Sequence, residues 1–243
     1  MFLPILEPIL INSSPLKICI VAASVLLSGC DNHKPASKNG DDLSNTPAAK
    51  PQGINKLQGN AAALAGPFGL AKGVTTDQLT NTFGFKAAET TSNVYEGTPP
   101  RPVEGLVDYI VLATKHSGVC RIVASTPVAI ANDSGDQVKA SVDRLAESLK
   151  IKYGDMAVKT NYVGSGTFKR NPDMWMIGLK DDSVIYGYTW ESKAAAQLPN
   201  ELRSVEVTAQ ASNSSNAYAK IVYTFNNFDA CTKDIKSAQA QNL

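Results

Sequence analysis

Residue types that carry out catalysis or bind metals are sparse in this chain of 243 residues. Its two histidines, His33 and His116, do not stand at the spacing from cysteines or carboxylates that a metal site requires. A serine hydrolase needs a base beside its nucleophile, and no G-x-S-x-G turn is present to hold such a nucleophile. The pattern therefore predicts a protein that is not an enzyme and that has no metal or other cofactor.

Two short segments have some of the residues of ion-binding loops. Residues 132–136 read Asn-Asp-Ser-Gly-Asp and gather carboxylates, but the segment is too short for a full set of calcium ligands. It is more typical of a helix start, where acidic residues stabilise the helix dipole. Residues 164–167 have the glycines of a phosphate-binding loop without the Gly-Lys-Ser/Thr ending, which indicates a turn.

An aromatic row offers the best candidate binding surface. Tyr186, Tyr188 and Trp190 alternate along one apolar segment, so in a strand all three project from the same face. If that face is exposed, it is a binding site for a protein partner, a peptidoglycan sugar or an apolar ligand. If a helix covers it, the three rings belong to the core. The sequence leaves both alternatives open.

A cysteine near the N-terminus follows an apolar run of the kind found in secretory signals. Residues 18–27 are almost all aliphatic or small, follow a lysine, and are too few to span a bilayer. The run ends in Leu27, Ser28, Gly29 and Cys30, which resembles the lipobox of bacterial lipoproteins. The resemblance implies cleavage between Gly29 and Cys30 and attachment of diacylglycerol, with acyl chains such as palmitate, to the Cys30 sulfur. An ordinary signal peptide with an unpaired cysteine is the alternative.

The lipoprotein resemblance also implies a subcellular location. Two or three long acyl chains would hold the mature protein at a membrane permanently. Asp31 after the cysteine resembles the enteric signal that retains lipoproteins in the inner membrane, with the body facing the periplasm; the outer membrane is the alternative. Glu7 and the absence of a positive charge before Lys17 are unusual for a signal peptide. They would be explained if Met1 were assigned too far upstream and translation began at a later residue.

Composition divides the chain into three parts. Residues 1–29 are the predicted signal peptide, residues 30–60 the lipidated cysteine and a disordered tether, and residues 61–243 a single globular domain. The tether has hardly any large apolar residues and cannot offset the entropy of ordering. The net charge of +1 gives no footprint for nucleic acid. The lipoprotein resemblance implies the membrane as a partner, and an envelope protein is the other expected partner.

Cysteine usage predicts one disulfide. Cys19 leaves with the signal and Cys30 carries lipid, so Cys120 and Cys231 are the remaining thiols in an oxidising compartment. A disulfide between them is the favoured interpretation, and two buried free thiols are the alternative. Redox chemistry is disfavoured because the two cysteines are far apart in sequence.

The elements that position these residues indicate an α+β fold. Apolar residues at three- and four-residue spacing predict one long amphipathic helix over residues 134–153. The helix packs, with shorter helices near residues 75–83 and 229–239, on an antiparallel sheet made of a hairpin and a β-meander. Residues 64–70 are at most an edge strand. The predicted strands are residues 106–114, 119–125, 174–179, 184–190, 205–211 and 217–225.

One helix entry resembles that of small envelope-assembly lipoproteins of the BamE kind. The matching residues are Gly73, Val74, Thr75, Leu79, Phe83 and Gly84. The order of hairpin, helix and meander is also similar to uncharacterised bacterial lipoproteins. Together these features predict a membrane-anchored, non-catalytic protein that acts by protein or envelope contact. A binding module for a small apolar or glycan ligand and a hydrolase without a recognisable motif are the alternatives.

Overall fold

The computed structural model describes residues 64–89, 91–164 and 166–241. These residues all fall within one compact unit that spans residues 51–243. The predicted signal peptide, Cys30 and most of the tether lie outside the described residues. None of the helices in these ranges has both the length and the apolar character needed to cross a bilayer.

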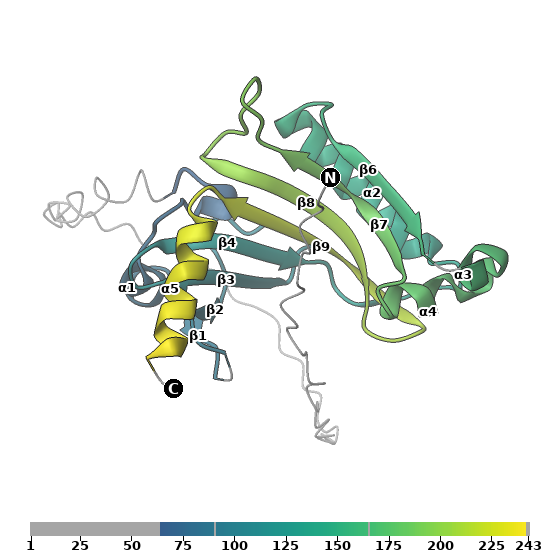
Figure 1. Cartoon of the computed structure of the whole chain (residues 1–243), viewed down its shortest axis with the longest axis horizontal. Coiled ribbons are helices and arrows are strands. Elements are labelled where there is room, and N and C mark those ends of the chain that lie inside the picture. Colours follow the sequence, from purple (N-terminus) through teal and green to yellow (C-terminus); the bar gives the residue numbers. More distant parts are fainter. Residues whose placement is uncertain (1–63, 90, 165, 242–243) are drawn as a thin grey trace, which may run out of the picture. The chain divides into compact units, whose positions relative to one another are not determined.

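An antiparallel sheet forms the centre of this unit (Figure 1). The strands run in the order β1-β2-β3-β4-β9-β8-β7-β6, and β5 pairs with β9 beside this path. Together with the helices, this sheet confirms the predicted α+β class. The strands are β1 (Lys86–Ala87), β2 (Val94–Glu96), β3 (Asp108–Thr114), β4 (Gly118–Ser125), β5 (Ala129–Ile130), β6 (Val158–Val163), β7 (Val184–Glu191), β8 (Leu202–Ala211) and β9 (Asn216–Phe225).

Helices pack on both sides of the sheet, and each covers a different group of strands. Helix α2 packs on β7, β8 and β9, α4 packs on β7 and β8, and α5 packs on β3 and β4. Helices α2 and α5 lie on opposite sides of the sheet (Figure 1). The helical segments are η1 (Pro67–Gly69), α1 (Thr76–Asn81), α2 (Asp136–Tyr153), α3 (Gly166–Arg170), η2 (Pro172–Met174), α4 (Trp175–Lys180) and α5 (Phe228–Ala240).

The start of α2 is fixed by its own side chains and by one glycine. The backbone N–H of Asp136 donates to the Asn132 side-chain oxygen at 2.8 Å, and the Asp136 carboxylate accepts hydrogen bonds from Asn132 and Ser134. These hydrogen bonds lower the pKa of Asp136. Gly135 adopts a positive φ of 71°, and a Cβ there would lie 2.1 Å from the Trp175 ring. Residues 132–136 thus build a helix entry, and the described residues contain no cluster of three metal-binding side chains.

The disulfide between Cys120 and Cys231 is present, as the sequence predicts. The two sulfurs lie 2.08 Å apart and join β4 to α5. Cys120 is an extra residue in β4, because Leu112 pairs with Arg121 whereas Ala113 pairs with Val119. Such a bulge re-aims a side chain, which lets Cys120 meet the helix. Helix α5 therefore has a covalent link to the sheet.

Several segments differ from the sequence predictions, among them α3, which begins at Gly166 within the turn predicted for residues 164–167. Residues 174–179, predicted as a strand, form most of α4, because Trp175, Met176 and Leu179 are buried at helical rather than alternating spacing. Residues 158–163, predicted as irregular, form β6, whose polar composition hides it. Residues 64–70, at most an edge strand by sequence, contain the 3-10 turn η1.

Candidate functional site: the open face of the sheet

The predicted aromatic row lies on the side of the sheet that α2 covers. Tyr186 and Trp190 are buried, with exposed fractions of 6% and 1%, and Tyr188 is half-buried. The Tyr186 ring meets the Trp175 ring of α4 edge-on, and Trp190 Nε1 donates to the Gly154 carbonyl at 2.9 Å. The structure thus places the row in the core, which is the second of the two alternatives that the sequence leaves open.

The two tyrosines of this row and Lys159 of the edge strand β6 contact the same carboxylate, that of Asp143. The hydroxyls of Tyr186 and Tyr188 both donate to Asp143 of α2 at 2.8 Å, and Lys159 of β6 lies 3.5 Å from the same carboxylate. Burial acts to raise the pKa of Asp143, but the two hydrogen bonds and the Lys159 charge bring it below its ordinary value. This cluster links β6 and β7 to α2, and its polar groups form hydrogen bonds and an ion pair with one another.

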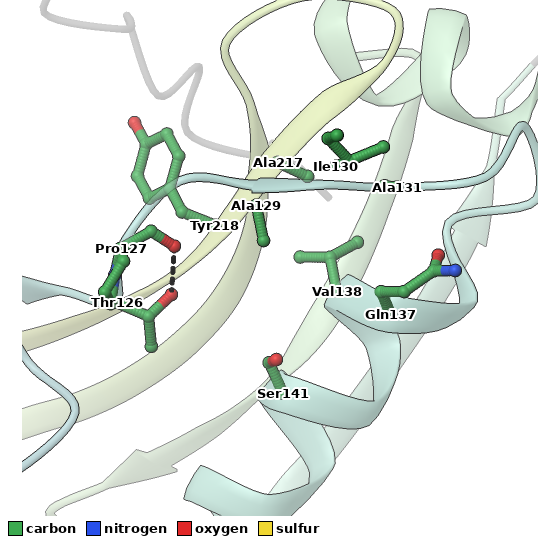
Figure 2. A pocket seen from close by; sticks show the side chains of 10 residues that line it. All are labelled: Thr126, Pro127, Ala129, Ile130, Ala131, Gln137, Val138, Ser141, Ala217 and Tyr218. Atoms are coloured by element: carbon green, nitrogen blue, oxygen red, sulfur yellow. Dashed lines mark hydrogen bonds between the residues drawn. The ribbon is translucent and has the colours of Figure 1, made fainter.

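A small pocket lies where β5 and the first turns of α2 approach the start of β9 (Figure 2). Its lining includes Ile130, Val138 and Tyr218, and its volume is about 40 Å³. A site for a drug-sized ligand is typically about 300–1,000 Å³, whereas a water molecule needs only about 10–15 Å³. This pocket therefore has room for water but not for a sugar or an organic ligand.

The opposite side of the sheet is less covered, and we call the side of β3, β4 and β6–β9 that faces away from α2 the open face. The strand register places its side chains in rows that run across the sheet. One row contains Val158, Thr189, Glu206, Val222, Val123 and Ile110. The next row contains Thr160, Gly187, Thr208, Lys220, Ser125 and Asp108.

Burial differs between the two sides of the central strands. On the α2 side, Val205, Val207 and Ile221 are buried, whereas on the open face Glu206 and Lys220 are half-buried and only smaller side chains such as Ser125 and Thr224 are buried. Helix α5 approaches the open face over β3 and β4, where the Phe228 ring lies 4.1 Å from the Arg121 guanidinium. The helix contacts of β7–β9 come mainly from α2 and α4, on the other side.

Three charged side chains occupy the middle of the open face. Burial lowers the pKa of Arg121 and of Lys220 from their ordinary values, while Glu206 acts on both in the opposite direction. Arg121 Nε donates to the Thr224 hydroxyl at 3.3 Å, and the Ser204 hydroxyl donates to Glu206 at 3.2 Å. Within the described ranges, none of the three charges has an opposite charge within ion-pairing distance. Hydrogen bonds and the Phe228 ring compensate these half-buried charges in part, and no ion pair among the described residues does.

Exposed apolar side chains flank this charged centre. Val158, Tyr162 and Ile185 have exposed fractions of 60%, 53% and 45%, and Tyr162 pairs with Ile185 across β6 and β7. Ile110, at the other end, is 36% exposed. Apolar and aromatic side chains around a few charges are typical of protein-binding surfaces.

Sequence reasoning missed the open face, although a signal for it is present. Along β8, Val205, Val207 and Ala209 alternate with polar residues, and β9 alternates in a similar way. Such alternation indicates a strand with one buried face and one solvated face. The predicted cleavage site at Gly29 and Cys30 lies outside the described residues, so the open face is the candidate site that the structure itself supplies.

Comparison of the chain with protein-family models, with curated proteins and with solved structures finds no match.

Proposed function

We propose that this chain is a bacterial lipoprotein that binds another envelope protein through the open face of its sheet. Acyl chains on Cys30 hold it at the inner membrane, or alternatively at the outer membrane, with the body facing the periplasm. The lipobox resemblance at Leu27 to Cys30 supports the anchor. The proposed role is non-catalytic, with no cofactor and no nucleic-acid partner.

One observation carries the binding role: the open face has half-buried charges that form no ion pair among the described residues. Removing a charge from water costs free energy unless opposite charges or hydrogen bonds replace the water. Arg121 and Lys220 bear part of this cost in the free protein, because burial lowers the pKa of both. A protein surface with complementary charges would recover it, and the exposed apolar groups would supply further area.

The open face favours a protein partner over a small ligand. A glycan or apolar ligand bound by Tyr186 and Trp190 would have to displace α2, because both side chains are buried beneath it. The open face is also broad, since its rows extend across six strands from β6 to β3. A wide surface with mixed apolar and charged residues is suited to another protein.

A photo-reactive amino acid at Thr208 tests this role. Thr208 lies in the middle of the open face, between Gly187 and Lys220 in its row. In cells that produce the full chain, we expect this probe to attach to a distinct envelope protein, because the contact surface covers that position. The measurement is mass-spectrometric identification of the crosslinked species.

The matched control carries the same probe at Arg144, which is exposed on α2. We expect little attachment there, because Arg144 lies on the far side of the sheet. Equal attachment at both positions, or no protein attached at Thr208, would contradict the proposed contact.

A further inference from the structure

Strand β6 is an unprotected edge of the sheet. It is the last strand in the order and pairs with β7 alone among the described strands, with a continuous register over Val158–Val163. Alternate N–H and C=O groups along its outer side therefore have no strand partner. Natural proteins usually protect such an edge with a very short strand, a proline, a bulge, charged side chains such as lysine, or a covering helix or loop. Strand β6 has no proline and no bulge, whereas the strand at the opposite edge, β1, is only two residues long.

The side chains of β6 also fail to protect it. Val158 and Tyr162 project from the open face and are more than half exposed. The one charged residue of the strand, Lys159, is directed to the other side, where it lies 3.5 Å from Asp143 of its own α2. Its charge is thus compensated within the chain and offers little repulsion to an approaching strand.

We propose that β6 pairs antiparallel with β6 of a second copy of this chain, so that two sheets join into one. The register that places Thr160 opposite itself gives the best pairing. It sets Val158 opposite Tyr162 twice, and pairs of a β-branched and an aromatic residue are favourable neighbours across strands. It also sets Lys159 opposite Asn161, so the two lysines do not face one another. Moving the two-fold axis to Asn161 would leave Val158 without a cross-strand neighbour.

A second copy fits this edge better than the chain's own N-terminal segment does. Residues 31–60 contain three prolines, and their few large apolar residues do not alternate in the period of a strand. The net charge of +1 gives two copies little reason to repel one another. The pairing would also bring two open faces together into one wider surface.

Cysteine crosslinking tests the pairing and its register in the full chain. Cys120 and Cys231 are already bonded to one another, which limits their interference. In the proposed register two copies of Thr160→Cys face one another across the two-fold axis, at a separation that a disulfide spans. Under mild oxidation we expect a reducible dimer in a non-reducing gel. Two control variants should form far less dimer. One is Ile151→Cys, which is on α2 and 91% exposed, and the other is Lys159→Cys, which lies one residue from the two-fold axis of the proposed register.

A second pair of variants separates specific pairing from chance contact. Tyr162→Lys, added to Thr160→Cys, removes both valine–tyrosine pairs and places charge on the edge, so we expect about a tenfold loss of dimer. Ile151→Lys in the same background should leave the dimer unchanged. Circular dichroism of both variants checks that the sheet is retained.

The proposal is overturned if Thr160→Cys forms no more dimer than Ile151→Cys, or if Tyr162→Lys has no effect. It is also overturned if Thr160→Cys is captured by a different protein. Because this assay detects a second copy at β6 and the Thr208 probe detects another protein at the middle of the open face, either proposal can fail while the other holds.

Discussion

Replacing Cys120 and Cys231 together with alanine should lower the free energy of unfolding substantially. The two residues are 111 positions apart, and closing a loop of that size is worth about 4–5 kcal/mol on the chain-entropy view. The other contacts of α5 include the Phe228 ring on Arg121, an ion pair between Asp229 and Arg203, and hydrogen bonds that Asp234 accepts from Thr114 and Ser117 at 2.6 and 2.7 Å. These hydrogen bonds cannot replace the covalent link. Chemical unfolding followed by circular dichroism measures the loss.

The parent protein treated with a reducing agent is the control for this variant. We expect reduction to shift its unfolding midpoint toward that of the double-alanine variant, because both treatments remove the same bond. An unchanged midpoint in both samples would show that the bridge contributes nothing to the stability of the fold.

Replacing Trp190 with alanine should also be strongly destabilising. Its side chain is 1% exposed, and its indole N–H donates to the Gly154 carbonyl at the end of α2. Removing a buried tryptophan costs about 3–5 kcal/mol, because a cavity remains and the surrounding structure relaxes only in part. The expected result is a large fall in the midpoint of thermal unfolding.

Two controls show what the tryptophan does. Trp190→Phe keeps an aromatic ring and should lose less stability, while Ile151→Ala changes a side chain that is 91% exposed and should have almost no effect. If Trp190→Ala kept the parent's stability, the aromatic row would not be the core that the structure describes.

The elements governed by local pattern could be predicted from the sequence. Apolar residues at helical spacing, among them Val138, Val142 and Leu149, predict a helix where α2 lies. The hairpin of β3 and β4 follows from two runs of β-branched residues that flank a short turn. The pairing of Cys120 with Cys231 follows from excluding the other two cysteines.

The parts that the sequence could not supply depend on tertiary contacts or on weak local signals. A short, largely apolar run such as the one in Trp175–Lys180 suits either a strand or a short helix, and packing against β7 and β8 decides for the helix. Strand β6 has a polar sequence and is held by pairing with β7 and by the bond of Lys159 to Asp143. Neither the packing of α4 on the sheet nor the contacts of β6 can be inferred from a short stretch of sequence.

The candidate site on the open face also depends on tertiary structure that the sequence does not reveal. Arg121, Glu206 and Lys220 are distant in sequence and come together because β4 lies next to β9 and β9 next to β8. The sequence showed that Tyr186 and Trp190 share one face, but not which face a helix covers. That choice depends on the path of α2 over the sheet, which is a property of the whole fold.

The identity of the first residue of the mature chain tests the anchored-lipoprotein account most directly. The full chain, produced in bacteria and extracted from membranes, would be analysed by mass spectrometry beside the Cys30→Ala variant. The account predicts a mature protein that begins at Cys30 and carries acyl chains, and a variant that remains an uncleaved precursor without them. A mature chain that begins elsewhere, or an unmodified chain in the cytosol, would contradict it.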